Sequence, residues 1–412
     1  MVISYNILRY VMNFINVIKP THLCNLACRY CYNEDERNPI MTLITLEKVI
    51  KETFDYVETV GGFTGVEFIW HGGEPFFVGI DFYNYVVLYQ KKHNKGINYI
   101  NTIQTNGTLI NNKWIKFIKD NDFIISLSID GDKNSHDLNR IYKNGKGSFD
   151  KVMKGAKKLK QNGINFGSVL VVNKINKNDV EELYRFFVKE KIVFNIIPLV
   201  KSGRANDNFQ DLGLDADEYF EPWRKVYDLW FDANDKEYIQ VSDFVRKTQS
   251  IIAGRAADCI GMSQCGNANC STDPLGDIYP CASLSGHNDL KYGNINQHTL
   301  YELFNIPVAY NWRNRPINQD CSVCQWQHVC HGGCQSRSYK FYAGDYRTKD
   351  YYCPSLKKMY EHIKNRLLER DIISATPYTN HMDDGLGETK AYLRDYLSLE
   401  KVRNRIPVIQ LY

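Results

Sequence analysis

Strand-like and helix-like runs alternate between Phe14 and Trp230, and this alternation constrains the fold more than any other feature of the chain. The predicted strands are Phe14–Pro20, Gly65–His71, Tyr99–Thr105, Phe123–Asp130, Asn165–Val172 and Val193–Val200. The predicted helices are Thr45–Val57, Asp81–His93, Asn112–Lys119, Ser148–Gln161, Lys177–Lys189 and Asp215–Phe231. Such alternation predicts a parallel sheet with right-handed crossovers. Because six units are too few to close an eight-stranded barrel, we expect an open α/β barrel with its chemistry at the carboxyl ends of the strands.

Three cysteines directly follow the first predicted strand. Cys24, Cys28 and Cys31 have the spacing C-x3-C-x2-C, and Tyr30 precedes the last of them. A cubane [4Fe–4S] cluster normally takes four cysteines, so three thiolates from one loop leave one iron open to a small molecule. Zinc sites instead combine a C-x2-C pair with a second Cys or His pair. The run therefore favours an iron–sulfur cluster over a zinc site or three buried thiols.

Nine of the twelve cysteines lie between Cys259 and Cys353. They include the dense run Cys321-x2-Cys324-x5-Cys330-x3-Cys334, and Cys265-x10-Gly276-x4-Cys281 upstream of it. Secreted disulfide frameworks are usually short chains, whereas this chain is long and alternates β and α patterns. We therefore expect metal ligation in a reducing cytoplasm, with zinc as an alternative for this half.

Charge and hydropathy do not indicate a nucleic-acid or membrane partner. The formal net charge is +4, and no basic stripe with interleaved aromatic residues stands out. The stretch Val2–Val17 is interrupted by Asn6, Arg9 and Asn13, which makes it too polar for a membrane span, and it lacks a signal-peptide cleavage site. We expect a cytoplasmic protein that binds neither nucleic acid nor membranes.

The loop from Cys24 to Cys31 resembles the signature of the radical S-adenosylmethionine (SAM) superfamily, C-x3-C-x-aromatic-C, with Tyr30 in the aromatic place. The resemblance implies that SAM chelates the open iron and is cleaved to a 5′-deoxyadenosyl radical, which abstracts a hydrogen atom from the substrate. It also implies a reductant such as flavodoxin or ferredoxin. The tasks left to the protein are placement, electron supply and exclusion of water.

Three further elements, each at the carboxyl end of a predicted strand, resemble SAM-binding motifs of this family. Gly72-Gly73-Glu74 resembles the GGE motif that binds the amino group of SAM. Ser128 resembles a serine that contacts the ribose, and Arg140 an arginine that contacts the carboxylate. Ile196 resembles a residue that packs near the adenine. The alternatives are a structural turn, a solvated loop arginine and plain strand core.

The C-terminal cysteines resemble the SPASM pattern, the auxiliary-cluster domain of radical SAM enzymes that act on peptides and proteins. By this resemblance, one auxiliary [4Fe–4S] cluster takes Cys259, Cys265, Cys281 and Cys334. The other takes Cys321, Cys324, Cys330 and Cys353. A short hairpin, Leu275–Pro280, would deliver Cys281. Together with the N-terminal loop, the chain is expected to hold three [4Fe–4S] clusters.

These resemblances divide the chain into four segments. We expect a radical SAM partial (β/α)6 barrel of TIM type in residues 1–235, a helical linker in 236–258, a SPASM domain in 259–355 and a helical tail in 356–412. Helices are predicted at Leu356–Arg370 and near Lys390–Arg403. The tail could dock a substrate, but we expect it to cover the open edge of the barrel, since exposed sheet edges are a liability.

The family named by these motifs is the SPASM maturases that modify peptides and proteins, including anaerobic sulfatase maturases. The resemblance implies hydrogen abstraction from a ribosomally made peptide and formation of a thioether or carbon–carbon crosslink. In sulfatase maturases a general-base aspartate follows the cysteine aligned with Cys281, but here the residue is Ala282, which cannot accept a proton. Sulfatase-type oxidation is therefore an alternative, as are aminoglycoside or sugar dehydrogenation and a non-enzymatic electron-transfer role.

Three points stay open from the sequence. Cys270 lies outside the three ligand sets, and we expect an inert core residue; exchange with Cys259, or hydrogen donation in a peptide epimerase, are the alternatives. No side chain is identified as a catalytic base. Because only about twenty residues precede Cys24, we expect either a separate leader-peptide-binding protein or a barrel that reads the peptide unaided.

Overall fold

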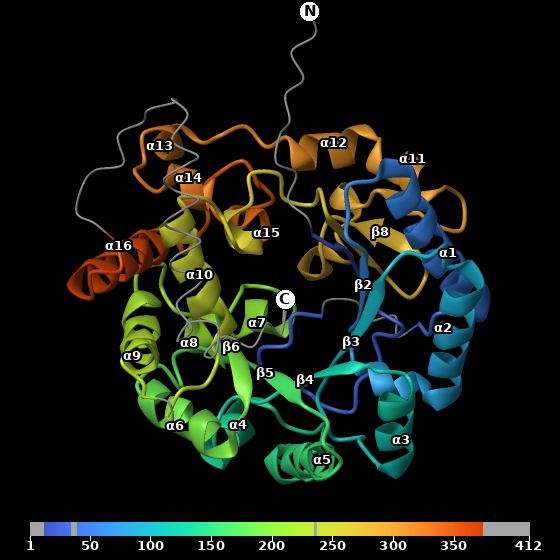
Figure 1. The fold of residues 1–412 in the computed structure, drawn as a ribbon, viewed down its shortest axis with the longest axis horizontal. Coiled ribbons are helices and arrows are strands. Elements are labelled where there is room, and N and C mark those ends of the chain that lie inside the picture. Colours follow the sequence, from blue (N-terminus) through green and yellow to red (C-terminus); the bar gives the residue numbers. More distant parts are fainter. Residues whose placement is uncertain (1–11, 34–38, 235–236, 374–412) are drawn as a thin grey trace, which may run out of the picture.

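The computed structural model describes residues 12–33, 39–234 and 237–373. Six strands follow one another in chain order and pair in parallel with their neighbours, which confirms the predicted α/β partial barrel (Figure 1). The strands are β1 Phe14–Ile18, β2 Val66–Trp70, β3 Tyr99–Thr105, β4 Ile124–Ser128, β5 Phe166–Val172 and β6 Val193–Pro198.

Each predicted helix is present, with ends that differ by a few residues. These helices are α1 Leu43–Val60, α2 Ile80–His93, α3 Asn112–Asp120, α5 Phe149–Gln161, α6 Val180–Glu190 and α9 Phe220–Phe231. Local capping explains two of the starts: Thr42 accepts from Thr45 N, and Asn111 accepts from Trp114 N. The barrel also contains short helices that periodicity did not reveal, namely η1 Pro75–Val78, α4 Lys133–Asn139, α7 Arg204–Asp207 and α8 Phe209–Leu212.

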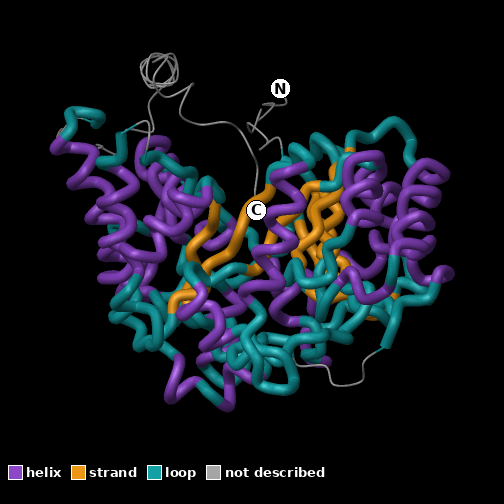
Figure 2. The backbone as a smooth tube through the Cα atoms, turned by 90° about the horizontal axis from the view of Figure 1, so that it is seen from below, coloured by secondary structure: helices purple, strands orange, loops and turns teal. Residues whose placement is uncertain are grey.

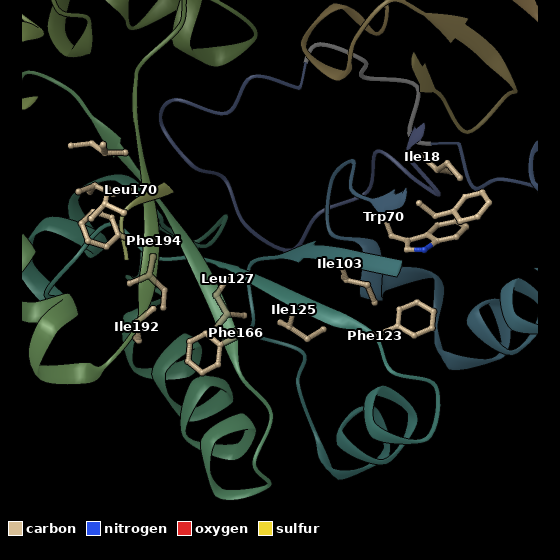
Figure 3. Packing of buried hydrophobic residues seen from close by; sticks show 14 of the residues in the cluster. Ile18, Trp70, Ile103, Phe123, Ile125, Leu127, Phe166, Leu170, Ile192 and Phe194 are labelled. Atoms are coloured by element: carbon tan, nitrogen blue, oxygen red, sulfur yellow. The ribbon is translucent and has the colours of Figure 1, made fainter. Parts of the chain in front are cut away.

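The hydrophobic core lies between the sheet and the surrounding helices. Alternate strand residues point to opposite faces, and Trp70, Ile103, Leu127 and Phe194 are fully buried on the helix side (Figure 3). Figure 2, seen from below, shows the strands between two groups of helices. Gln104, the neighbour of Ile103 on β3, is on the opposite face, where it donates to Ser128 Oγ at 3.0 Å. None of the helices in the described part of the chain is long and apolar enough to cross a membrane.

The C-terminal region extends the barrel sheet at the β1 edge. Strand β7, Asn269–Thr272, pairs in parallel with β1, and β8 Asp277–Tyr279 and β9 Gly293–Asn294 continue the sheet antiparallel. The sequence predicted the hairpin but not the pairing of β7 with β1, because a partner some 250 residues away leaves no local periodic signal. This pairing covers one open edge of the barrel and brings the C-terminal cysteines toward the loop that follows β1.

Helices cover the β6 side of the barrel. The described segment contains α10 Ser242–Ala253, which contacts β6, and α16 Cys353–Glu369, which packs on α9 and α10 (Figure 1). Polar contacts fix α16 to α9, including an ion pair of Arg366 with Asp228 at 3.4 Å and a contact of His362 Nε2 with Asp228 Oδ1 at 2.7 Å. The first predicted helix of the tail therefore lies against the helices of the barrel, whereas the one near Lys390–Arg403 lies outside the described residues.

The remaining helices belong to the cysteine-rich region and are short. They are η2 Cys259–Gly261, η3 Ala282–Leu284, η4 Asn288–Leu290, α11 Leu300–Phe304, α12 Pro307–Arg313, α13 Gln319–Ser322, α14 Gln327–Cys330 and α15 Gln335–Phe341. Many of the C-terminal cysteines lie on or beside these short turns, so little regular structure surrounds them.

Candidate cluster and cofactor site

The N-terminal cysteine loop is held between the carboxyl ends of several barrel strands. Ala27 N donates to Ile141 O at 2.7 Å and Arg29 N to Asn139 O at 2.9 Å, which ties the loop to the end of α4. On the other side, Glu74 N donates to Leu23 O at 2.7 Å. The backbone of the loop is therefore positioned by protein contacts.

A third contact comes from the segment after β6, which the sequence analysis did not identify. Ser202 Oγ donates to Tyr32 O at 3.1 Å, and Asn208 Nδ2 donates to Arg29 O at 2.9 Å. A Cβ at Gly203 would lie 2.5 Å from Cys31 O, so only glycine allows this close approach. The cysteine loop thus contacts the segments that follow β2, β4 and β6.

The thiols of this loop fit a cluster with an open iron. Burial raises the pKa of Cys24 to about 11 and that of Cys28 to about 12. Cys24 Sγ accepts from Leu26 N at 3.4 Å. Buried thiols become thiolates readily when a bound metal supplies positive charge. Three soft sulfur donors on one loop are the ligand set that leaves one iron of a cubane free.

The Gly-Gly-Glu segment after β2 packs directly on this loop. A Cβ at Gly73 would lie 2.3 Å from Leu23 O, and one at Gly72 2.4 Å from Thr21 O. Glu74 is fully buried, and its carboxylate accepts from Thr105 Oγ1 at 2.6 Å and from Asn106 N at 2.8 Å. Burial raises the pKa of Glu74 to about 7. The glycines allow the close packing, and the carboxylate joins the ends of β2 and β3.

Tyr30 and Arg140 converge on one carboxylate that the sequence analysis had not singled out. The Tyr30 hydroxyl donates to Asp130, and Arg140 Nε donates to Asp130 Oδ2 at 3.0 Å. The guanidinium lies over the Tyr30 ring, 5.2 Å from its centroid. Ser128, at the end of the same strand, accepts from Gln104 Nε2 at 3.0 Å. Of these expected SAM-site residues, Ser128 ends β4, Arg140 follows α4, and Tyr30 in the loop after β1 meets Arg140 at Asp130.

The structure places Ile196 away from these residues. Its side chain is buried in the helix-facing core with Phe194, because alternate residues of β6 share a face. Ile197 instead packs against the cluster that contains Tyr30. The side chain of this segment that lies near the Tyr30 cluster is therefore Ile197 rather than the expected Ile196.

Four C-terminal cysteines line one small pocket. They are Cys321, Cys324, Cys330 and Cys353, the set that the sequence analysis assigned to one auxiliary cluster. Trp326 and Tyr360 form apolar walls, and Lys349 and Lys357 also line the cavity. Four soft thiols around a partly apolar cavity are a suitable donor set for a cubane.

The other assigned set is also brought together. Burial, followed by the charges of Cys259, Cys334 and Cys281, raises the pKa of Cys265, which shows that the four thiols lie close together. Cys281 Sγ is 2.9 Å from Ser283 Oγ. No group of His, Cys, Asp or Glu side chains in the described ranges is arranged to hold a single metal ion. A cubane spreads its ligands over four irons.

Lys19 lies between the two regions at the end of β1. Its side chain is almost fully buried, and Nζ lies 5.1 Å from the centre of the Tyr32 ring. Burial lowers the pKa of Lys19 to about 8, while nearby Cys281 and Cys31 act to raise it. His71 Nδ1 accepts from Gly72 N at 2.7 Å, and burial lowers the pKa of His71 to about 4, so its ring is neutral. The sequence analysis did not identify Lys19. The signal that could have identified it is a lysine directly after the apolar strand Phe14–Ile18.

Comparison with known proteins agrees with this geometry. The model of the radical SAM superfamily matches residues 18–187, and that of the SPASM iron–sulfur cluster-binding domain matches residues 264–325. The cysteine-type anaerobic sulfatase-maturating enzyme of Clostridium novyi is 32% identical over 84% of this chain and 94% of its own length. The serine-type anaerobic sulfatase-maturating enzyme of Bacteroides thetaiotaomicron is 29% identical over 84% of this chain and 88% of its own length.

The chain belongs to the radical SAM/SPASM maturases. The solved structure of native anSMEcpe with bound AdoMet and Kp18Cys peptide has a TM-score of 0.77 at 26% identity, covering 86% of this chain and 98% of that one. Streptococcus suis SuiB bound to precursor peptide SuiA shares the fold, with a TM-score of 0.61 at 19% identity over 83% of this chain and 76% of that one. This maturase is thus an enzyme that binds SAM and iron–sulfur clusters.

In this maturase, Cys270 lies in the core. The thiol is fully buried on β7, opposite Asn16 of β1, and belongs to the same hydrophobic cluster as Phe14. Burial raises its pKa. Its neighbour Ser271 points to the other face of the sheet, where its hydroxyl contacts Ser285. This placement agrees with an inert core residue, because the Cys270 thiol lies in the hydrophobic core on the helix side of the sheet.

Proposed function

We propose that this enzyme uses SAM and three [4Fe–4S] clusters to modify one residue of a ribosomally made peptide or protein. The proposed product is a thioether or carbon–carbon crosslink that begins with abstraction of a hydrogen atom. One observation carries the proposal: the backbone N of Lys19, the residue after β1, donates to Thr272 O of β7 at 2.8 Å, and its Nζ lies 5.1 Å from the centre of the ring of Tyr32, the residue after Cys31. The N-terminal cysteine loop and the cysteine-rich region therefore meet at the carboxyl end of β1.

The chain contributes placement to this chemistry. When bound, SAM and the clusters supply a 5′-deoxyadenosyl radical and a route for one electron. We assign the SAM amino group to the Gly72-Gly73-Glu74 segment, the ribose to Ser128 and the carboxylate to Arg140. Cys24, Cys28 and Cys31 would hold the first cluster, and the two C-terminal sets of four would hold the others. The buried Lys19 carries positive charge between ligand sets that are negative when bound to clusters.

A peptide substrate is supported by the relatives. The similar structure of anSMEcpe contains AdoMet and the Kp18Cys peptide, and the relatives from Clostridium and Bacteroides are named for maturation of sulfatases. An electron donor such as flavodoxin or ferredoxin would complete the system. If the substrate carries a leader, a separate binding protein or the barrel itself would recognise it.

The residue after Cys281 favours a crosslink over formylglycine formation. The resemblance expects a general-base aspartate at this position, but Ala282 has no group that accepts a proton. Cys281 Sγ instead lies 2.9 Å from the hydroxyl of Ser283, which lies 2.6 Å from the hydroxyl of Ser336. The second candidate is the sulfatase-type oxidation, which the 32% identity over 84% of the chain favours.

Mass spectrometry separates the two candidates. The anaerobically reconstituted enzyme would be incubated with SAM, dithionite and either a sulfatase-derived cysteine peptide or a peptide encoded beside its gene. A crosslink removes two hydrogens and keeps the sulfur, whereas oxidation of cysteine to formylglycine replaces the thiol sulfur with a carbonyl oxygen. We expect the first change on the neighbouring peptide. Formylglycine on the sulfatase peptide at a comparable rate would reject the crosslink in favour of sulfatase-type oxidation.

An Ala282→Asp variant sharpens this test. If the missing carboxylate limits sulfatase-type oxidation, the variant gains formylglycine formation while its SAM cleavage stays the same. If the variant gains nothing and the wild type already makes formylglycine, the argument from Ala282 is wrong.

A further inference from the structure

Asp130 is a fully buried carboxylate at which three parts of the barrel meet. It follows β4 and accepts from the Tyr30 hydroxyl, from Arg140 Nε at 3.0 Å and from Arg140 Nη2 at 3.3 Å. Val171 N, on β5, donates to Asp130 Oδ1 at 3.4 Å. One side chain thus joins the cysteine loop, the end of α4 and a barrel strand.

The Arg140 guanidinium is fixed on two sides. The paired contacts to Asp130 set the plane of the guanidinium, and the Tyr30 ring lies 5.2 Å from it. A guanidinium has five N–H donors, and Asp130 engages only part of them. Because the side chain is already ordered, the guanidinium can bind a carboxylate through its other donors without a further loss of side-chain entropy on binding.

The backbone of Arg140 is held by a separate network. Ser148 Oγ donates to Arg140 O at 2.7 Å, and His136 Nε2 lies 2.9 Å from the same hydroxyl. His136 Nδ1 accepts from Asp130 N at 3.4 Å, and burial lowers the pKa of His136 to about 3, so the ring is neutral and donates from Nε2. Losing the Asp130 charge would therefore release the Arg140 side chain while its main chain stays in place.

We propose that Asp130 is a positioning residue for SAM, which orients the Arg140 guanidinium toward the carboxylate of the bound cofactor. The inference rests on the assignment of Arg140 to that carboxylate. Tyr30 has a supporting part, because its hydroxyl shares the Asp130 carboxylate and its ring lies under the guanidinium.

The test compares two ligands on the reconstituted holoenzyme, SAM and decarboxylated SAM, by equilibrium binding. In Asp130→Asn we expect the Kd for SAM to rise about tenfold or more, the size of one charge-assisted hydrogen bond. The Kd for decarboxylated SAM should change less than about threefold, because that ligand lacks the group that Arg140 would bind. Tyr30→Phe should also raise the Kd for SAM more than the Kd for decarboxylated SAM, but by a smaller factor than Asp130→Asn. Asp150→Asn, an exposed residue paired with Lys133, is the matched control.

Arg140→Met separates the two claims. If Arg140→Met weakens the binding of SAM more than that of decarboxylated SAM and Asp130→Asn does not, Asp130 is not a positioning residue. If Arg140→Met affects both ligands equally or neither, the assignment of Arg140 itself is wrong. A purely structural role would weaken both ligands together and lower the iron content of Asp130→Asn. If that variant does not fold, Tyr30→Phe decides: selective loss for SAM supports the inference, and equal or no loss overturns it.

Discussion

The barrel and the cysteine-rich region reach order by different means. The barrel uses helices of up to 18 residues and a continuous apolar core. Between Cys259 and Tyr352 no helix exceeds seven residues, and seven of the nine cysteines lie on or beside short helices and turns, whereas Cys270 is on β7 and Cys353 begins α16. The difference predicts that packing alone holds the first region, whereas we expect the second region to depend also on the groups that its thiols bind. The N-terminal cysteine loop belongs to the first kind, since backbone contacts hold it.

The largest expected effect contrasts one cysteine from each region. Cys330→Ala removes one of the four thiols that line the pocket and that we assign to an auxiliary cluster, and it should lower the thermal midpoint by about 5 °C or more, with loss of about four irons. Cys24→Ala should abolish SAM cleavage but shift the midpoint less. Calorimetry and iron analysis under anaerobic conditions measure both. Equal shifts in the two variants would erase the contrast between the regions.

A substitution of Glu74 tests whether its buried hydrogen bonds hold the ends of β2 and β3 together. Glu74→Ala leaves Asn106 N and Thr105 Oγ1 without their buried acceptor, so we expect a loss of about 2–5 kcal/mol in the free energy of unfolding. Denaturant titration measures it. The exposed Glu58→Ala is the control. A change below about 0.5 kcal/mol in Glu74→Ala would show that the carboxylate does not hold the strand ends together.

The next effect is a pH dependence of the free energy of unfolding that comes from His136, a residue of the barrel. Burial lowers the pKa of His136 to about 3, below its value of about 6.5 in an unfolded chain. Below pH 6.5 the unfolded state therefore binds a proton that the folded state does not, and stability falls with falling pH. Between pH 7.5 and 5.5 this group should remove about 1.4 kcal/mol from the free energy of unfolding.

His136→Gln should remove that part of the pH dependence, whereas His298→Gln at the surface should leave it intact. Denaturation at the two pH values measures the difference. Identical pH profiles for wild type and His136→Gln would mean that His136 is not held neutral in the fold.

The smallest effect concerns Cys270, the thiol of the cysteine-rich region that lies in the barrel core. Cys270→Ala should cost about 1 kcal/mol of stability through the small cavity it leaves. Iron content, SAM cleavage and the stereochemistry of the product should not change. Loss of activity with iron retained would instead give this thiol a chemical role.

The same contrast explains what the sequence could predict. Local periodicity located the strands well, and Tyr99–Thr105 is found with its predicted bounds. The resemblance to the SPASM pattern implied two sets of four thiols, and the structure brings each set together. By contrast, the pairing of β7 with β1 joins distant segments and leaves no local signal. Asp130 could not be assigned because its role depends on Arg140 and Tyr30 meeting in space, and Ile196 was chosen without knowing which face of β6 turns inward.

The most direct test of the central claim is the iron and sulfide content per chain after anaerobic reconstitution. Wild type would be measured beside a Cys24→Ala/Cys28→Ala/Cys31→Ala variant. The account predicts about twelve irons in the wild type and about eight in the variant, with SAM cleavage lost and the fold retained. About four irons in the wild type, together with bound zinc, would show that the C-terminal cysteines do not hold auxiliary clusters and would contradict the account.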